Sequence, residues 1–101
     1  MSTALIKVAL VQEVSEGDAQ SNLLRIEQRV AEAVQQGAQL VLLQELHNGA
    51  YFCQHESADE FDRAEPIPGP SCDRLSALAK RHGVVLIGSL FERRAAGLYH
   101  N

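Results

Sequence analysis

Residues 37–46 read Gly-Ala-Gln-Leu-Val-Leu-Leu-Gln-Glu-Leu, and this stretch decides how the chain is expected to fold. Its apolar centre, residues 40–43, is short and uninterrupted, which is typical of a strand covered on both faces. Gly37 is suited to the left-handed backbone position that follows a helix. The polar pair Gln44-Glu45 comes directly after the apolar run. The stretch therefore predicts the end of a helix, a buried strand and a polar strand terminus.

The residues before this stretch complete a strand–helix–strand unit. Residues 4–11 are mostly apolar and β-favouring, so they predict a first strand that is also covered on both faces. Asp18 is suited to cap a helix, because its carboxylate can accept hydrogen bonds from the free N–H groups of the first turn. Apolar residues then recur at helical spacing: Leu23, Ile26, Val30, Ala33 and Val34. Two strands joined by a helix in this way are expected to run parallel.

The residues after it begin with a long connection, 46–70, which contains two His, two Gly, three Pro and five acids. A connection of this length is usually functional or holds a short helix, which residues 58–62 could supply. Ser71 is predicted to cap a second helix that Gly83 ends, with one face formed by Leu75, Leu78, Ala79 and His82. A third strand is expected over 84–91, then a turn over 93–97 and the start of a fourth strand at Leu98. This order predicts an α/β fold.

The composition excludes several classes of protein. The 101 residues carry 9 Lys and Arg against 13 Asp and Glu, a formal charge of −4, which argues against nucleic-acid binding. No apolar run approaches the roughly 18 residues that a membrane span needs. The first residues lack a signal-peptide pattern, and the two cysteines suit a reducing compartment. We therefore expect one domain at most, in a cytoplasmic protein without nucleic-acid or membrane partners.

Glu45 is the first candidate for chemistry. It follows the second expected strand, and ligands of open α/β folds bind at the carboxyl ends of strands. Neighbouring leucines would partly desolvate its carboxylate and make it a better base. On position alone, a structural role as a loop cap or as the partner of a surface Arg is slightly favoured.

Cys53 is a second candidate, because His47 and His55 lie near it in sequence and a His can activate a thiol. It follows two aromatic residues, however, and a small packed hydrophobic residue is the alternative. The spacing of these His and Cys residues fits no zinc pattern, and glycine-rich nucleotide motifs are missing. No metal and no cofactor are therefore expected. Cys72 is interpreted as an ordinary helix residue.

Two segments together resemble the nitrilase, or carbon–nitrogen hydrolase, superfamily: residues 6–12, Ile-Lys-Val-Ala-Leu-Val-Gln, and residues 37–46. Residues 51–54, Tyr-Phe-Cys-Gln, are similar to one branch of it, the N-carbamoylputrescine amidases. Pro68-Gly69-Pro70 and the elements after it come in the expected order. The resemblance covers essentially all 101 residues.

The resemblance implies that residues 1–101 are the N-terminal third of a single, incomplete domain, part of a four-layer αββα sandwich that often forms homo-oligomers. Catalysis in the family uses Glu, Lys and Cys, and Glu45 matches the Glu, the base that activates the thiol. The thiolate attacks the ureido carbon of N-carbamoylputrescine and putrescine leaves. Water then releases carbamate, which yields carbon dioxide and ammonia, while the Lys stabilises the tetrahedral state.

The chain departs from the family pattern in one respect. The catalytic Lys and Cys are expected beyond Asn101, and neither Lys80 nor Cys53 matches them. The 101-residue piece is therefore expected to be inactive by itself. Tyr51, just after the base, is expected to line a narrow aliphatic channel for the substrate.

Further alternatives concern the substrate and the class of protein. The acids of residues 46–70 either form a negative rim that attracts a cationic diamine or are simply a solvated loop. A related amidase for ureido or ω-amido acids would need Arg or Lys near the substrate, and this connection offers only Arg63. The remaining possibility is a non-catalytic piece, such as an inactive fragment or a small α/β interaction domain.

Overall fold

The structure is a computed structural model, and it describes residues 4–15, 18–49 and 58–101. The described chain begins with β1 (Val8–Val11), α1 (Ala19–Gln35) and β2 (Leu40–Leu43). A short 3₁₀ helix η1 (Ala58–Arg63) follows, then α2 (Pro70–His82), β3 (Val85–Ile87), β4 (Glu92–Ala95) and β5 (Leu98–His100). The alternation of strands and helices confirms the predicted α/β fold.

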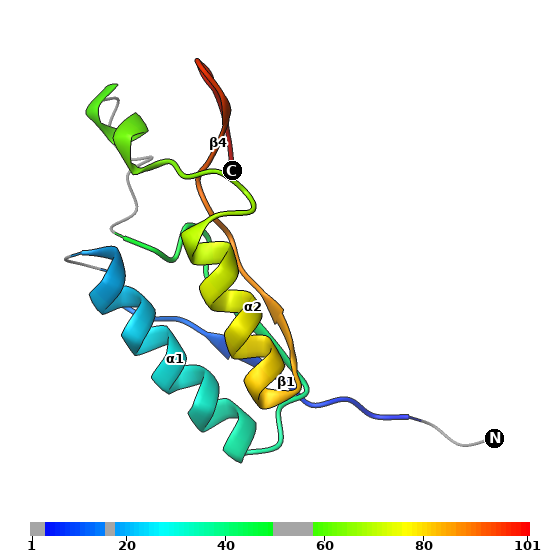
Figure 1. The fold of residues 1–101 in the computed structure, drawn as a ribbon. Helices are drawn as coiled ribbons and strands as arrows, with labels where there is room; N and C mark the ends of the chain where they lie inside the picture. The colour runs from blue at the N-terminus through cyan, green and yellow to red at the C-terminus, as the bar shows by residue number, and fades with distance from the viewer. Residues whose placement is uncertain (1–3, 16–17, 50–57) are drawn as a thin grey trace.

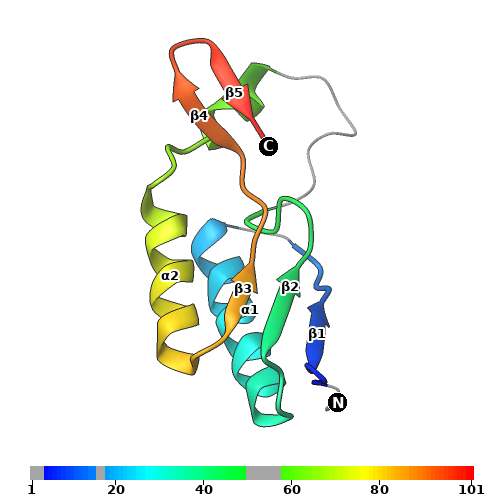
Figure 2. The same ribbon diagram turned by 90° about the vertical axis from the view of Figure 1, so that its right-hand side faces the viewer.

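The main sheet has three parallel strands in the order β1-β2-β3. Its register aligns Val8 with Leu40 and Leu40 with Val85. Figures 1 and 2 show α1 and α2 on the same face of this sheet. Two right-handed crossovers that advance in the same direction place both helices there.

The core lies between this face and the two helices. Val30 of α1 and Val41 of β2 are completely buried, and Leu78 contributes from α2. The core cluster consists of Ile26, Val30, Ala38, Val41, Leu43 and Leu78. Burying aliphatic side chains of this size stabilises the fold by roughly 1.5–3 kcal/mol each, so this cluster holds the helices on the sheet.

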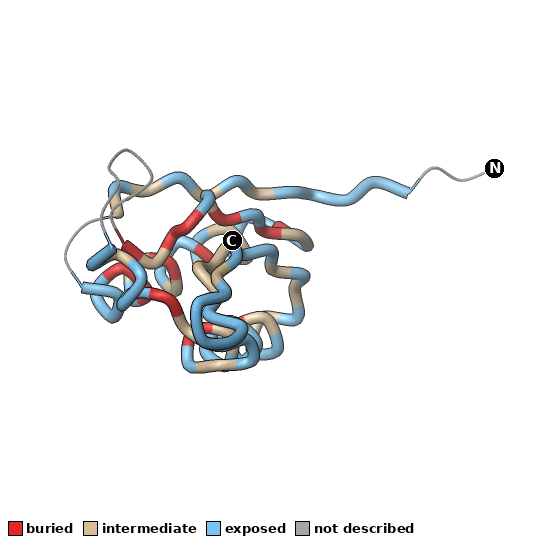
Figure 3. The backbone as a smooth tube through the Cα atoms, turned by 90° about the horizontal axis from the view of Figure 1, so that it is seen from above, coloured by how far each residue is buried: buried red, intermediate tan, exposed pale blue. Residues whose placement is uncertain are grey.

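The opposite face of the sheet is open. Alternate apolar residues on it are exposed, from Leu10 at 75% through Leu42 at 39% to Ile87 at 45%. The prediction that the strands are covered on both faces is therefore wrong for the described chain, because both helices pack on one side. The chain before β1 is exposed and extends away from the body (Figure 3). In a four-layer sandwich, the open face packs against a second sheet.

The helix ends follow local signals in most positions. Asp18 caps α1 as predicted, and its Oδ1 accepts a hydrogen bond from the Ser21 backbone N–H at 2.8 Å. That bond and a second from the Ser21 hydroxyl lower the pKa of Asp18. Gly37 after α1 and Gly83 after α2 have φ of 93° and 63°, the left-handed conformation expected of them.

The start of α2 differs from the prediction. The capping position is Gly69, with Pro70 as the first helical residue, so Ser71 lies inside the helix. The Ser71 backbone N–H and hydroxyl both donate to the Glu65 carboxylate, each at 2.9 Å. Glu65 therefore satisfies the free N–H group that a capping Ser would have served, from a position six residues earlier in the chain.

The end of the chain confirms the predicted strand that starts at Leu98, but differs from the prediction of a long third strand over 84–91 and a turn over 93–97. β3 ends at Ile87, and residues 92–95 form β4, which pairs antiparallel with β5. The charged residues of β4 are largely exposed, so this hairpin forms without a buried face. Gly97, at φ 74°, lies in the turn between the two strands.

The hairpin is held by the residues before α2 rather than by the main sheet. The backbone of Glu65 bonds to Phe91 and Arg93 at 3.0 and 2.8 Å. The ring of Phe61 in η1 lies 4.4 Å from that of Tyr99 between centroids, and Phe91 joins them. This aromatic cluster explains why the hairpin lies beside η1 in Figure 2.

Candidate active site

Glu45 lies in the turn that directly follows β2, at the carboxyl end of the parallel sheet. The next residue, Leu46, has φ 49°, which lets the chain reverse there and buries the Leu46 side chain. The carboxylate of Glu45 is exposed. The expectation that neighbouring leucines desolvate it is wrong for the described chain, because those leucines point into the core or lie on the open face.

Within the part of the chain that the structure describes, the hydrogen-bond partner of Glu45 is an amide and not an Arg. The Asn101 Nδ2 group donates to Glu45 Oε1 at 2.7 Å. The hydroxyl of Ser89, just after β3, donates to Asn101 Oδ1 at 2.9 Å. These two bonds join the carboxyl ends of β2 and β3 through the residue that follows β5.

Gln44 anchors the strand end on which Glu45 is carried. Its Oε1 accepts from the Glu13 backbone N–H at 2.6 Å, and its Nε2 donates to the Ser15 hydroxyl at 3.0 Å. The Ser15 hydroxyl in turn donates to the His47 carbonyl at 3.2 Å. The Gln44 side chain therefore ties the turn that carries Glu45 to the segment that follows β1.

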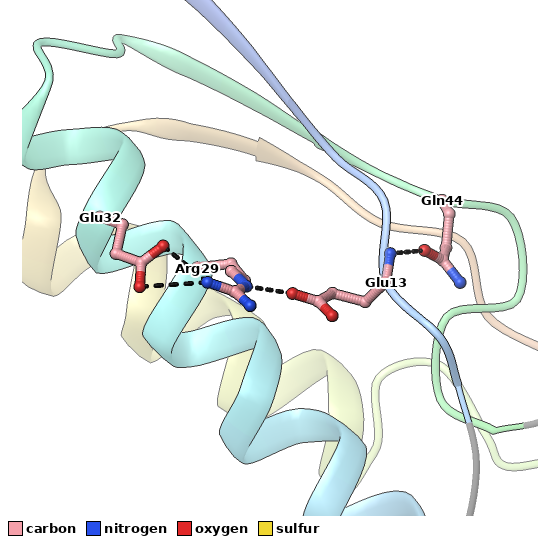
Figure 4. Close-up of polar contacts among 4 residues, drawn as sticks. All are labelled: Glu13, Arg29, Glu32 and Gln44. Carbon is pink, nitrogen blue, oxygen red and sulfur yellow. Dashed lines mark hydrogen bonds and ion pairs between the residues drawn. The ribbon is translucent and has the colours of Figure 1, made fainter.

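An ion-pair network continues from Glu13 to α1. Figure 4 shows the Arg29 guanidinium between the carboxylates of Glu13 and Glu32, beside the bond from Glu13 to Gln44. The bonds to Glu13 and Glu32 raise the pKa of Arg29, which keeps it charged. Helix α1 is therefore linked to the carboxyl end of β2 by side chains as well as by the core.

His47 is buried directly beneath the same turn. His47 is 1% exposed, and within the described chain neither of its ring nitrogens has a hydrogen-bond partner. Burial lowers the pKa of His47 to about 4, with the Asn48 side chain acting in the opposite direction. The ring is therefore neutral at physiological pH and too enclosed to act as a base on a substrate. Cys53 and His55, considered above with His47, lie outside the described residues.

Two hollows open at this end of the sheet. The first, of about 360 Å³, lies between the start of α1 and the end of β3, and Asn48, Arg63 and Phe91 are among its lining residues. The second, of about 490 Å³, lies between α2 and the end of β3, and its lining includes Ser89 and Asn101. Cys72 lines the second hollow from α2 as a free thiol. Both hollows lie where an α/β fold binds ligands.

The acidic connection is partly neutralised by its own contacts. Glu60 forms an ion pair with Arg63 at 2.8 Å, and the Glu65 carboxylate accepts two hydrogen bonds from Ser71. Asp59 and Asp62 are exposed on η1. Tyr51 and Glu56, the other residues of interest in this connection, lie outside the residues that the structure describes.

Two further features are absent from the described residues, a metal-binding cluster and a helix that could span a membrane. No group of three or more His, Cys, Asp or Glu side chains there is arranged to hold a metal ion. No helix in that part of the chain is long and apolar enough to cross a bilayer.

Two residues of the site were missed by sequence reasoning. Asn101 is 56 residues from Glu45, and Ser89 is 12 residues from Asn101. Neither lies in a motif or a periodic pattern that would mark it. The contact arises because the β4–β5 hairpin brings the residue after β5 back to the end of β2, which a local signal cannot reveal.

Comparison with known proteins gives a consistent assignment. The family model for carbon–nitrogen hydrolases matches residues 7–101. An N-carbamoylputrescine amidase of Solanum lycopersicum is 40% identical over 98 residues, covering 96% of this chain and 33% of that protein. A citrullinase of Francisella tularensis is 33% identical over 99 residues, covering 97% of this chain and 35% of that protein.

A solved structure agrees with the sequence matches. The crystal structure of a carbon–nitrogen hydrolase from Helicobacter pylori superposes with a TM-score of 0.88 at 38% identity, covering 95% of this chain and 33% of that one. The chain spans about a third of the length of these relatives. A family match over nearly the whole chain, with the same backbone arrangement, shows that the chain belongs to the carbon–nitrogen hydrolase family and has the matching part of the nitrilase-type fold.

Proposed function

We propose that the protein carrying this chain hydrolyses N-carbamoylputrescine to putrescine, carbon dioxide and ammonia. The observation that carries the proposal is the place of Glu45. It stands exposed at the carboxyl end of β2, beside two hollows, on a turn that side-chain bonds tie to the rest of the fold. A carboxylate in such a position can take a proton from a reacting group.

In the proposed mechanism, Glu45 takes the proton of a cysteine thiol that lies later in the protein. The thiolate adds to the ureido carbon, the C–N bond to the diamine breaks, and the departing amine receives the proton from Glu45. A carbamoyl thioester remains, and Glu45 then activates the water that cleaves it to carbamate and free thiol. A lysine, also later in the protein, stabilises the oxyanion of each tetrahedral state.

The amine substrate is supported by the chemistry around the site. Arg63, a positive charge in the lining of the first hollow, is offset by its ion pair with Glu60. The exposed Asp62 adds negative charge on η1, which suits the ammonium group of a diamine better than a carboxylate. We place Tyr51 along the aliphatic part of the substrate.

The rival function is hydrolysis of a ureido or ω-amido acid, favoured by the similarity to a citrullinase. Citrulline and N-carbamoylputrescine differ by one α-carboxylate, so they form a matched pair of substrates. We expect the full-length protein to have the higher kcat/KM on N-carbamoylputrescine, with citrulline and N-carbamoyl-β-alanine as comparisons. A preference for either acid would overturn the proposed substrate.

The role of Glu45 is tested by Glu45→Gln in the full-length protein. Loss of a general base typically costs 10²–10⁴-fold in rate, so kcat is expected to fall at least about 100-fold with the fold intact. Glu27→Gln is the matched control, because it makes the same change at a carboxylate of α1 that pairs with Arg74. Wild-type kcat in Glu45→Gln would remove Glu45 from the mechanism.

Three further properties belong to the same proposal. The 101-residue chain alone is expected to be inactive, since residues matching the catalytic Lys and Cys are not among its own. We propose that the full-length protein is a cytoplasmic homo-oligomer that uses no cofactor. Turnover by the purified 101-residue chain, or a monomer by light scattering of the full-length protein, would contradict the corresponding statement.

A further inference from the structure

We propose that Asn101 and Ser89 are positioning residues that hold the Glu45 carboxylate in its reactive orientation. The inference rests on the proposed function, because it assigns a role to residues that act through the proposed base. Asn101 touches Glu45, and Ser89 touches Asn101, so the three side chains form one relay.

The relay has a defined direction. An ionised carboxylate only accepts hydrogen bonds, so the Asn101 amide must present its N–H to Glu45 and its carbonyl to Ser89. The Ser89 hydroxyl donates to that carbonyl, at 2.9 Å, and the amide donates to Glu45 Oε1 at 2.7 Å. The acceptor-only carboxylate therefore sets the orientation of the Asn101 amide, and the Ser89 hydroxyl holds that amide in place by donating to its carbonyl.

The relay holds the Oε1 atom of the Glu45 carboxylate and leaves the Oε2 atom available. The bond to Oε1 is charge-assisted, and such bonds are shorter and stronger than neutral ones. Within the described residues Oε1 is the hydrogen-bonded atom, so Oε2 is left to receive the thiol proton. A base must come within about 2.6–3.2 Å of the group whose proton it takes. Glu45 is exposed, so the bond from Asn101 is what holds its carboxylate within the described residues.

The position of the relay also suits a catalytic site. Ser89 and Asn101 both line the hollow of about 490 Å³ between α2 and the end of β3. Ser89 follows β3 and Glu45 follows β2, so the relay spans the neighbouring carboxyl ends of two parallel strands. A displacement of about 1 Å in a catalytic group can cost on the order of 100-fold in rate, so holding this carboxylate has a kinetic consequence.

The test uses Asn101→Leu and Ser89→Ala in the full-length protein, assayed on N-carbamoylputrescine. Loss of a hydrogen bond to a charged group costs about 10- to 100-fold, so kcat of Asn101→Leu should fall by that factor. Ser89→Ala should fall by about 3- to 10-fold, since it removes only the second bond of the relay. KM should stay within about 2-fold of wild type, because neither residue is assigned a contact with the substrate.

A double-mutant cycle separates positioning from a merely structural role. Glu45→Asp keeps a carboxylate but withdraws it by one methylene from the Asn101 amide. In that background Asn101→Leu should cost less than about 3-fold in kcat, because the contact has already been lost. Gln28→Leu, an amide-to-leucine change on the exposed face of α1, is the control and should leave kcat unchanged.

The outcomes distinguish the two proposals. Wild-type kcat in Asn101→Leu and Ser89→Ala, in a protein that Glu45→Gln inactivates, overturns the relay alone. An equal loss from Asn101→Leu in both backgrounds, with a lowered unfolding midpoint, also overturns it. Wild-type kcat in Glu45→Gln overturns the proposed function, and the relay with it.

Discussion

Protonation of His47 should destabilise the fold as the pH falls below neutral. The imidazole is buried beneath the turn that carries Glu45, and burial lowers the pKa of His47 to about 4. A histidine in the unfolded chain has a pKa of about 6.5. The unfolded state therefore binds the proton first, and stability is fully present above pH 6.5 and is lost as the pH falls toward 4.

The size of the expected stability loss follows from the two pKa values of His47, which are about 4 in the folded chain and about 6.5 in the unfolded chain. The difference of about 2.5 units corresponds to roughly 3 kcal/mol when both states are protonated. At pH 5 the unfolded histidine is almost fully protonated and the buried one is mostly neutral, so the expected loss is about 2 kcal/mol.

The assay is urea unfolding of wild type and His47→Leu at pH 8 and pH 5. Leucine removes the titrating group without leaving a buried polar atom unpaired, so the variant should lose about 2 kcal/mol less than wild type over this interval. Gln28→Leu, a change of a non-titrating residue on the exposed face of α1, is the control and should show the wild-type pH dependence. Equal pH dependence in wild type and His47→Leu would refute the reasoning, as would an NMR titration of His47 near pH 6.5.

Other predictions concern the contacts that hold the site in place. In Gly88→Ala, the new Cβ would lie 3.1 Å from His47 Nε2 and 3.0 Å from Leu75 Cδ1, so unfolding free energy should fall by about 1–3 kcal/mol in urea melts. Leu78→Ala removes a core side chain that is 3% exposed and should cost about 2–5 kcal/mol in the same assay. Asp18→Ala should weaken protection of the first-turn amides of α1 in hydrogen exchange, whereas Asp18→Asn, which keeps a capping oxygen, should retain most of it.

Local features of the fold could be predicted because their causes lie within a few residues. The run at residues 40–43 is apolar enough to form a strand in the middle of a sheet, and it does so. Asp18 caps the helix that follows it, and Gly37 and Gly83 occur where helices end. Each depends on backbone geometry and on partners close in sequence, so the residue type is sufficient evidence.

The predictions that were wrong concern features that depend on residues distant in the sequence. Ser71 was expected to cap α2, but Glu65 reaches the same N–H group from a loop whose path is not encoded locally. Strand β4 carries exposed charges, so hydrophobic patterning predicts a turn there, although the strand beginning at Leu98 is confirmed as β5. Exposure on one face of the sheet follows from the handedness of both crossovers, which places α1 and α2 together on the other face.

The candidate site likewise has features that the sequence predicts and features that only the tertiary structure reveals. Sequence alone determined that Glu45 follows a central strand and that the chain resembles the carbon–nitrogen hydrolases, because strand pattern and motif are contiguous in the chain. Only the tertiary structure decided that His47 is buried and neutral beneath that turn and that Asn101 and Ser89 hold the Glu45 carboxylate. Burial and hydrogen bonding between residues 56 positions apart arise when helices, sheet and hairpin pack together, and no short segment contains that information.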